Sequence, residues 1–576
     1  MPPSNNEEDN NKKLVTYDEV LELSINKKPK SPPLSRGRWC WTRLGCSSGI
    51  FQNVLLFMVC ILWNSNDALL FMIGFLTKVP NQFECYSDDT GEWSPCTKQQ
   101  ICDQGIASDH YRPVTSDPEY IDNWVSADKL DLLCESKEKI GLFGSMFFIG
   151  LCTTVILVPA LADKPFGRKP LVLTGNILMI ICMIGCILSK NIYEVYVFLF
   201  IDGASFAGRV IVATTYYIEY APERMKEIGP FVLQLSYPIT FFLIIIWYQF
   251  IDNSWFWLQI IMLISMILAT LYLIIFVPES PKWLYTWKRF DESKQVLKKV
   301  AKYNAVDDDK IESEIANCKF IDEDAEEDPD NKSVATSLSQ KMETGTYIKN
   351  LIVNTILWST LSFTFYVLSF MTKYYEGGLY LNYYLDASAN LTGALIALPI
   401  YTWLRMRWAF VVTIGLTFTG VLFIMCFQEG YIDPGWITAF GVDPSPEPEG
   451  SKAYLDHYNS RLVPALVFIC KTANEASFVF IYQVSFTQDL IFPFYKRATS
   501  VGIANFIARL ITITSSIVAE LDRPLPAIII LCFNGLAFIV SFLLPSRKEE
   551  IDYQNEKEQY MKSVKGGSID DNKSKK

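Results

Sequence analysis

The stretch Asp163-Lys-Pro-Phe-Gly-Arg-Lys-Pro170 separates two apolar runs, residues 139–162 and 170–189. Each run is long enough to cross a bilayer as a helix, which takes about twenty mainly apolar residues. Only a helix or a closed barrel can do so, because lipid offers no partner to free backbone amides. The charged stretch between the runs must then turn back at the membrane surface, so this region predicts a helical hairpin that crosses a membrane twice.

The same alternation of apolar runs and charged connections continues through the 576 residues, 50% of which are hydrophobic. A gap from 278 to 346 divides the apolar runs six and six. We therefore expect an all-α polytopic membrane protein with about 12 transmembrane helices in two six-helix halves. The expected spans are 50–77, 139–162, 170–189, 193–218, 228–251, 254–277, 347–372, 378–404, 408–427, 462–485, 499–519 and 524–544.

Lys and Arg in the short connections predict the orientation, because cytosolic loops carry more of them. The richer set of alternate connections holds Lys164, Arg168 and Lys169, and later Lys496 and Arg497. Both termini should then be cytosolic, which agrees with a polar N-terminus that lacks the apolar core of a signal peptide. The expected parts are the tail 1–49, the half 50–277 with its outward loop 78–138, the linker 278–346 with an amphipathic helix, the half 347–544 with its outward loop 428–461, and the tail 545–576.

The outward loop 78–138 contains four cysteines: Cys85, Cys96, Cys102 and Cys134. An even set in a polar segment on the oxidising side of a membrane predicts two disulfides, with three connectivities open. A zinc site fits less well, because the loop has no C-x-x-C pair and only one His, His110. We expect no metal here.

Several classes of function find no support in the sequence. The net charge of -11 does not suggest nucleic acid as a partner, and the acidic run 322–328 indicates a solvated linker. There is no G-x-x-x-x-G-K-[ST] motif, so transport would be gradient-driven or facilitated. Both His, His110 and His457, fall in outward loops away from any catalytic constellation. We expect neither an enzyme nor a cofactor.

The two halves echo each other at their cytosolic ends. An acid, a helix-ending Pro and a basic pair follow the fourth span from Glu219 and the tenth from Asp489. Asp163 and Arg168 can form an ion-pair latch with Glu219 that closes the cytosolic side and stabilises an outward-open state, while Gly167 allows a tight turn. The alternative is an ordinary positive-inside turn. The expected gating residues are Asp163, Gly167, Arg168, Glu219, Arg224, Asp489 and Arg497.

Two motifs resemble known transporters. The 163–170 stretch resembles the signature loop of major facilitator carriers, G-x-x-x-D-[RK]-x-G-R-[RK], with Pro159 at the leading Gly. Pro278-Glu-Ser-Pro-Lys-Trp-Leu284 and the amphipathic stretch to Tyr303, which can lie along the cytosolic surface, are similar to the organic ion transporter family of cation, anion and carnitine carriers. This resemblance covers all but the termini, the acidic linker and 428–461. It implies the major facilitator fold and alternating-access transport of a small charged organic solute.

Ionisable side chains inside spans cost on the order of 2.5–3.5 kcal/mol each, so they normally face a partner or a wet cavity. Lys471 and Glu475 lie one helical turn apart and can satisfy each other, and Arg209 can be neutralised by Asp67 or Asp386. Asp202 is expected near the interface. The expected substrate-binding residues are Arg509, Asp386, Asn390, Tyr383, Gln234, Tyr237, Trp358, Tyr366, Lys471 and Glu475.

Arg509 bears on the charge of the solute, because a guanidinium inside a span cannot escape by deprotonation. The family resemblance implies an Arg at this position in anion and carnitine carriers, and Asn390 stands where its cation carriers tend to have Glu. We expect an anion or a carnitine-like zwitterion, with a cation as the alternative, and a coupling proton or sodium ion left open. A sugar or neutral-solute carrier and a non-transporting sensor also fit the sequence. The plasma membrane is the expected location, with an endomembrane as the alternative.

Overall fold

The computed structural model describes residues 13–15, 49–65, 69–88, 91–164, 166–306, 318–320, 344–448, 450–488, 490–492, 494–553 and 555. Apart from five short strands, the elements in these ranges are helices. Long apolar helices satisfy their own backbone groups, which is what a membrane requires of a spanning segment.

The first half of the chain forms most of its expected spans as helices broken at one point. The first span consists of α3 and α4, the second of α6 and α7, and the fourth of α9, a π-helical segment η2 and α10. The helices are α3 (Ile50–Asn64), α4 (Ile73–Leu76), α6 (Lys137–Thr154), α7 (Leu157–Ala162), α8 (Arg168–Leu188), α9 (Ile192–Phe206), η2 (Ala207–Val212), α10 (Ala213–Ile218), α11 (Glu223–Ile246), η3 (Trp247–Ile251), α12 (Trp255–Phe276), α13 (Pro281–Thr286) and α14 (Phe290–Tyr303).

The second half has fewer and longer helices. Its elements are α18 (Thr344–Met371), η4 (Thr372–Tyr374), α19 (Leu379–Gln428), η5 (Pro434–Phe440), α20 (Lys452–Thr487), α21 (Phe494–Thr512), α22 (Ser515–Ala519) and α23 (Leu525–Ser541). α19 contains two expected spans, which meet at Arg405, whose backbone is non-helical with φ 63°. Within the described residues, nine helices are long and apolar enough to cross a membrane, and α3 and α23 are shorter apolar helices. With α19 counted as two spans, the prediction of about twelve is confirmed.

The outward loop 428–461 is shorter than we expected from the sequence. Its polar, proline-rich composition predicts a flexible insertion, but η5 occupies part of it and α20 begins at Lys452. The Ser451 hydroxyl caps this helix by accepting the Tyr454 backbone N–H. The cap allows the helix to start in polar sequence, before the apolar run that marked the predicted span.

The cysteine-bearing loop 78–138 forms a three-stranded sheet of order β3-β2-β4, with β2 (Phe83–Ser87), β3 (Glu92–Cys96) and β4 (Tyr111–Pro113). A helix, α5 (Lys98–Gln104), follows β3. Disulfides join Cys85 to Cys96 and Cys102 to Cys134. The expectation of two bonds is confirmed, and the connectivity that the sequence left open is fixed. The other small sheet pairs β1 (Lys13–Val15) with β5 (Cys318–Phe320).

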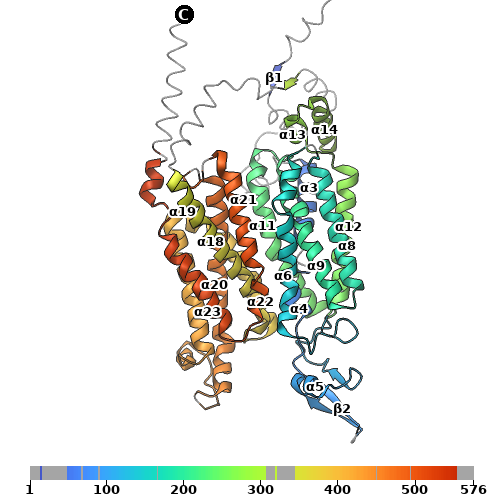
Figure 1. Ribbon diagram of the computed structural model, residues 1–576, viewed down its shortest axis with the longest axis vertical. Helices are drawn as coiled ribbons and strands as arrows, with labels where there is room; N and C mark the ends of the chain where they lie inside the picture. Colours follow the sequence, from blue (N-terminus) through green and yellow to red (C-terminus); the bar gives the residue numbers. More distant parts are fainter. Residues whose placement is uncertain are drawn as a thin grey trace, which may run out of the picture. The chain divides into compact units, whose positions relative to one another are not determined.

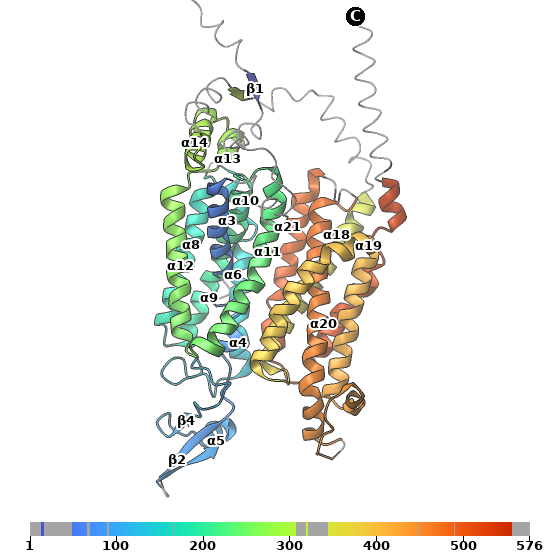
Figure 2. The same ribbon diagram turned by 180° about the vertical axis from the view of Figure 1, so that it is seen from behind.

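The chain folds into two compact units that differ from the two expected halves. Unit 1 comprises Met1–Leu70, Ile149–Thr240 and Phe256–Asp328, and unit 2 comprises Phe71–Phe148, Phe241–Trp255 and Pro329–Lys576. Segments of the first half thus join the second, because α4, the start of α6 and η3 pack on it. Figure 1 shows α8 and α9 side by side in unit 1, and Figure 2 shows α18, α19 and α20 together in unit 2.

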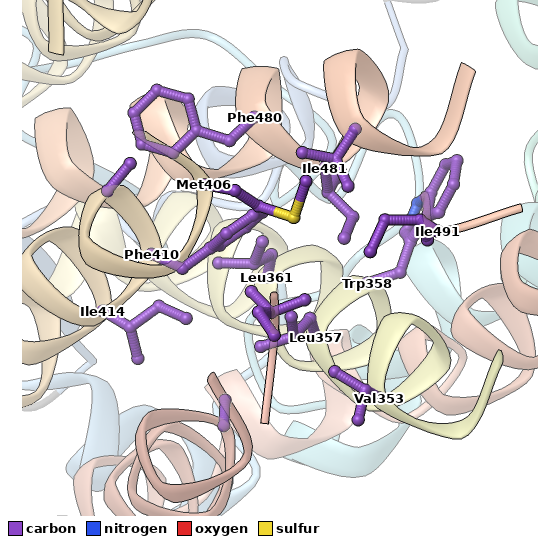
Figure 3. Close-up of a cluster of buried hydrophobic side chains, with 14 of the residues drawn as sticks. Val353, Leu357, Trp358, Leu361, Met406, Phe410, Ile414, Phe480, Ile481 and Ile491 are labelled. Carbon is purple, nitrogen blue, oxygen red and sulfur yellow. The ribbon is translucent and has the colours of Figure 1, made fainter. Parts of the chain in front are cut away.

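Packing inside each unit follows from side-chain size. In unit 1, a Cβ on Gly175 of α8 would lie 2.8 Å from the Arg209 backbone nitrogen, so glycine lets α8 approach η2 closely. In unit 2, buried aliphatic and aromatic side chains of α18, α19 and α20 interdigitate (Figure 3). This cluster includes Val353, Leu357, Trp358, Leu361, Met406, Phe410, Ile414, Phe480, Ile481 and Ile491.

Candidate functional site

Arg509 lies on α21 in unit 2 and is only 7% exposed. Its Nη1 donates to the Tyr366 hydroxyl of α18 at 3.4 Å, and it also bonds the Tyr482 hydroxyl of α20. Glu475 lies close enough to Tyr482 for their charges to interact. Three helices thus place two phenol groups around one guanidinium, with Glu475 in the neighbourhood of Tyr482. The structure brings Arg509, Tyr366 and Glu475 together as the sequence predicted, and adds Tyr482.

Aromatic rings surround the Arg509 group. Phe148 meets the Tyr366 ring edge-on at 4.6 Å, and Phe71 stacks on it at 6.2 Å. Trp358 packs edge-on against Tyr482 at 5.0 Å. Such rings present an apolar surface and a π-face that can hold a cation. We call this set the aromatic cluster: Phe71, Phe148, Trp358, Phe365, Tyr366, Phe478 and Tyr482.

Asp386 and Lys471 form a separate buried ion pair in unit 2. Lys471 Nζ lies 2.5 Å from Asp386 Oδ1, and both side chains are 1% exposed. The Thr372 hydroxyl and the Asn390 amide donate to the carboxylate, and Lys471 also donates to Ser369. Asp386, Asn390 and Lys471 therefore lie together as predicted. The structure corrects the expected partnership of Lys471, because its ion pair is with Asp386 on α19 rather than with Glu475 on its own helix.

Tyr383, the remaining predicted residue of this unit, is buried in a ring stack. It lies 4.1 Å from the Phe75 ring, which in turn stacks on Tyr248 at 4.9 Å. Beside this stack, Lys373 Nζ lies 2.8 Å from Glu520 and donates to Thr77. These contacts join α4 and η3 of the first half to η4, α19 and α22 of the second, and we call Phe75, Tyr248, Lys373, Tyr383 and Glu520 the outer cluster.

Sequence reasoning did not single out the buried pair of Lys373 and Glu520. Both lie at ends of predicted spans, where a charge needs no partner, so only their burial distinguishes them. The sequence did mark Lys373 as one of the few basic residues on the sparsely charged side of the membrane. That scarcity was the available signal.

Unit 1 contains a buried pair of its own. Arg209 Nη2 lies 2.8 Å from Asp202 Oδ1, and both side chains are fully buried. The same guanidinium donates to Ser205, Ser65 and the Leu62 carbonyl. Asp202 is thus the internal partner of Arg209 rather than a residue near the interface. Asp67, one of the partners expected for Arg209, lies outside the described residues.

Two other predicted substrate residues, Gln234 and Tyr237, also belong to unit 1. Both lie on α11 and are partly exposed. The members of the Arg509 group named above all lie in unit 2.

The predicted latch at the α13 end of unit 1 is assembled. Arg168 binds Glu219 with two nitrogens at 2.9–3.1 Å, and its Nη2 lies 3.1 Å from Asp163. Glu219 is buried, whereas the Asp163 side chain is 76% exposed. Burial raises the pKa of Glu219, and the nearby Arg168 offsets part of that rise. We call Asp163, Arg168, Glu219 and Glu279 the latch cluster.

Glu279 joins the latch through the backbone. Its carboxylate accepts the N–H groups of Arg168 and Lys169 at 3.1–3.2 Å, at the first turn of α8. A helix N-terminus favours an anion in this way. Gly167 has φ 81°, and a Cβ there would lie 2.5 Å from this carboxylate, so the glycine is required on both counts. The sequence predicted the tight turn at Gly167 but not its partner.

The second-half counterparts of the latch are only partly described. Arg497 donates to the Phe492 carbonyl at 3.3 Å. Asp489, and in the first half the side chain of Arg224, lie outside the described residues. Their gating role therefore stays a prediction.

Comparisons with known proteins agree with this architecture. Residues 71–415 match the family model described as "Sugar (and other) transporter". An organic cation transporter protein of Drosophila melanogaster is 24% identical over 72% of this chain and 70% of its own length. The human organic cation/carnitine transporter 2 is 24% identical over 72% and 68%. The inward-open structure of the xylose transporter XylE from E. coli covers 86% of this chain and 96% of its own, with TM-score 0.53 and 14% identity.

Proposed function

Since the chain belongs to the sugar (and other) transporter family, we propose that it carries a small charged organic solute across a membrane by alternating access. Members of this family are transporters of the major facilitator fold rather than enzymes. Relatives named as organic cation, organic anion and carnitine transporters support an organic ion as the cargo. The solute that best fits the Arg509 group is an anion or a carnitine-like zwitterion.

The observation that carries this choice is the chemistry around Arg509. Its guanidinium is held by the neutral hydroxyls of Tyr366 and Tyr482, within the aromatic cluster. A carboxylate offers a planar, charged acceptor, and a charge-assisted bond is roughly twice as strong as one to a neutral group. An anionic solute therefore gains by replacing a phenol at Arg509.

Asp386, another buried acid of unit 2, is poorly suited to bind a cationic solute. Asp386 is already bonded to Lys471, Thr372 and Asn390, so a cation would have to displace a buried lysine. Leaving a buried charge without its partner is costly. The ammonium of a zwitterion instead has the π-faces of the aromatic cluster beside Arg509.

Alternating access needs two closures that form in turn, and two clusters supply candidates. We assign the outer cluster to closure of the outward side, where Phe75 and Tyr383 stack beside the Lys373–Glu520 pair. The latch cluster is assigned to the cytosolic side, with both termini cytosolic and the plasma membrane as location. The positive-inside pattern of the short connections supports this orientation.

Uptake by the purified chain in proteoliposomes tests the proposal. We expect saturable uptake of a radiolabelled carboxylate or carnitine-like zwitterion, little uptake of tetraethylammonium, and none of glucose. Parallel assays with proton and sodium gradients identify the coupling ion. Glucose uptake without uptake of any charged solute would contradict the proposal, as would binding of a solute that is never transported.

A further inference from the structure

α13 and α14 carry a concentrated positive charge on a chain whose net charge is -11. Residues 281–303 contain seven basic and two acidic side chains. These helices follow directly on α12, an apolar span that ends at Phe276. We call their basic residues the basic α13–α14 surface: Lys282, Lys288, Arg289, Lys294, Lys298, Lys299 and Lys302.

One face of α14 is packed against the protein, so the remaining faces of the helix point away from it. Val296, Leu297 and Val300 are buried, at helical spacing. Just beyond the helix, the Asn304 side chain accepts the Phe51 backbone N–H at 2.9 Å, at the start of α3. α14 is therefore held at the ends of the spans of unit 1 (Figure 2). Its lysines are not among the buried residues of the helix, and Lys299 and Lys302 are exposed.

Two acidic side chains near this surface, Glu279 and Glu292, are already engaged. Glu279 accepts backbone N–H groups in the latch cluster, and Glu292 is paired with Arg289 at 2.6 Å. Lys282, Lys299 and Lys302 are exposed, and in the part of the chain that the structure describes no carboxylate forms an ion pair with them. The charge of these three lysines is therefore directed to the surroundings.

Apolar side chains accompany the charge. Trp287 on the α13–α14 connection is 44% exposed, and Phe166 in the latch turn is 63% exposed. Phe166, Trp283 and Lys299 line an open cleft of about 360 Å³ between the latch turn and α14. Lysines beside exposed aromatic rings at the end of a span suit the headgroup layer of a bilayer, where rings insert and ammonium groups meet phosphates.

From this arrangement we propose that the basic α13–α14 surface binds the headgroups of anionic phospholipids in the adjacent leaflet. Each basic residue near an anionic leaflet contributes about a fivefold gain in affinity. Three lysines that face outward thus give a preference of roughly a hundredfold for an anionic over a zwitterionic lipid. The surface would hold α14 against the membrane and keep anionic lipid beside the latch cluster.

Native mass spectrometry of the full chain in mild detergent tests this, with phosphatidylserine and phosphatidylcholine as the probes. We expect retained phosphatidylserine in preference to phosphatidylcholine. The triple variant Lys282→Gln/Lys299→Gln/Lys302→Gln should lose this preference by one to two orders of magnitude. The control Lys190→Gln/Lys452→Gln/Lys548→Gln removes the same charge from exposed lysines of other segments and should behave like the native chain.

Equal retention of the two lipids by the native chain would overturn the proposal. So would an equal loss of phosphatidylserine in both triple variants, because charge alone, and not this surface, would then attract the lipid. The chain's own acidic run 322–328 is the rival occupant. In its favour would be a native chain that shows no preference for phosphatidylserine, while a variant with the acidic run 322–328 neutralised shows one. In that case the acidic run, and not lipid, occupies the surface. Thermal unfolding of each variant shows that it is folded.

Discussion

Arg209 and Arg509 are both arginines inside spans, yet their surroundings differ. Arg209 has a carboxylate at 2.8 Å and three further acceptors, and is fully buried. Arg509 is bonded to the neutral hydroxyls of two tyrosines and keeps some exposure. Since a guanidinium stays charged, its acceptors indicate its role. The contacts identify Arg209 as part of a structural ion pair, and we propose Arg509 as the arginine that contacts the solute.

The largest effect is expected on breaking the Arg209 pair. Arg209→Ala leaves the Asp202 carboxylate buried without its cation, which costs about 3–5 kcal/mol of folding free energy. We expect a large fall in the thermal unfolding temperature or loss of folded protein on size-exclusion chromatography. As a control, Arg112→Ala removes an exposed pair with Glu84 and should cost less than about 1 kcal/mol. Normal stability of Arg209→Ala would contradict the structural assignment.

The Asp386–Lys471 pair sharpens the comparison, because the sequence suggested it for the solute. If the pair is structural, Lys471→Ala should lower the unfolding temperature strongly, and Lys471→Met/Asp386→Leu should restore much of the loss by removing both buried charges. Transport by the double variant is the decisive readout. Full loss of uptake with restored stability would return Asp386 or Lys471 to the solute site.

The latch cluster should respond less in stability than in transport. Burial raises the pKa of Glu219 despite Arg168, so the ionised pair gives little net folding energy. We expect Glu219→Gln to impair uptake and to lower stability less than Arg209→Ala does, because the amide oxygen can still accept from the buried Arg168. Asp163→Asn, at an exposed position, should reduce uptake less. Equal, full uptake by both variants at normal surface level would rule the latch out.

The raised pKa of Glu219 also predicts a pH dependence. A carboxyl whose pKa is higher in the folded state contributes stability that is present below its unfolded pKa and lost as pH rises through the folded pKa. The unfolding temperature of the native chain, relative to that of Glu219→Gln, should therefore fall as the pH rises from the pKa of glutamate in the unfolded chain to the raised pKa of Glu219 in the folded chain. A pH-independent difference between the two would contradict the shift.

Sequence alone predicted the spans, because length and hydropathy suffice for that. It could not predict that residues 71–148 and 241–255 would join the second half, since this depends on contacts such as Phe75 with Tyr383. The even number of cysteines in the loop 78–138 predicted two disulfides but not their connectivity. The sequence also did not predict that two spans would follow each other directly in α19. Only at Arg405, between them, does the backbone depart from helical geometry.

The candidate site was predicted in composition but not in pairing. Arg509, Tyr366 and Glu475 were found because charged and aromatic residues stand out in apolar runs. The ion-pair partners were assigned wrongly or missed, because local spacing favoured Glu475 for Lys471, whereas the fold supplies Asp386 from another helix. Glu279 was missed for a similar reason, since its partners are backbone N–H groups.

The most direct test of the account is the half-saturation concentration for an anionic or zwitterionic solute in native, Arg509→Ala and Arg509→Lys proteoliposomes. Loss of a charge-assisted bond costs about 1.5–3 kcal/mol, so Arg509→Ala should raise this concentration roughly tenfold to a hundredfold. Lys, which lacks the bidentate fork, should restore it in part. Arg461→Ala, at an exposed site on α20, is the matched control. Unchanged half-saturation in Arg509→Ala, with uptake of tetraethylammonium by the native chain, would contradict the central claim.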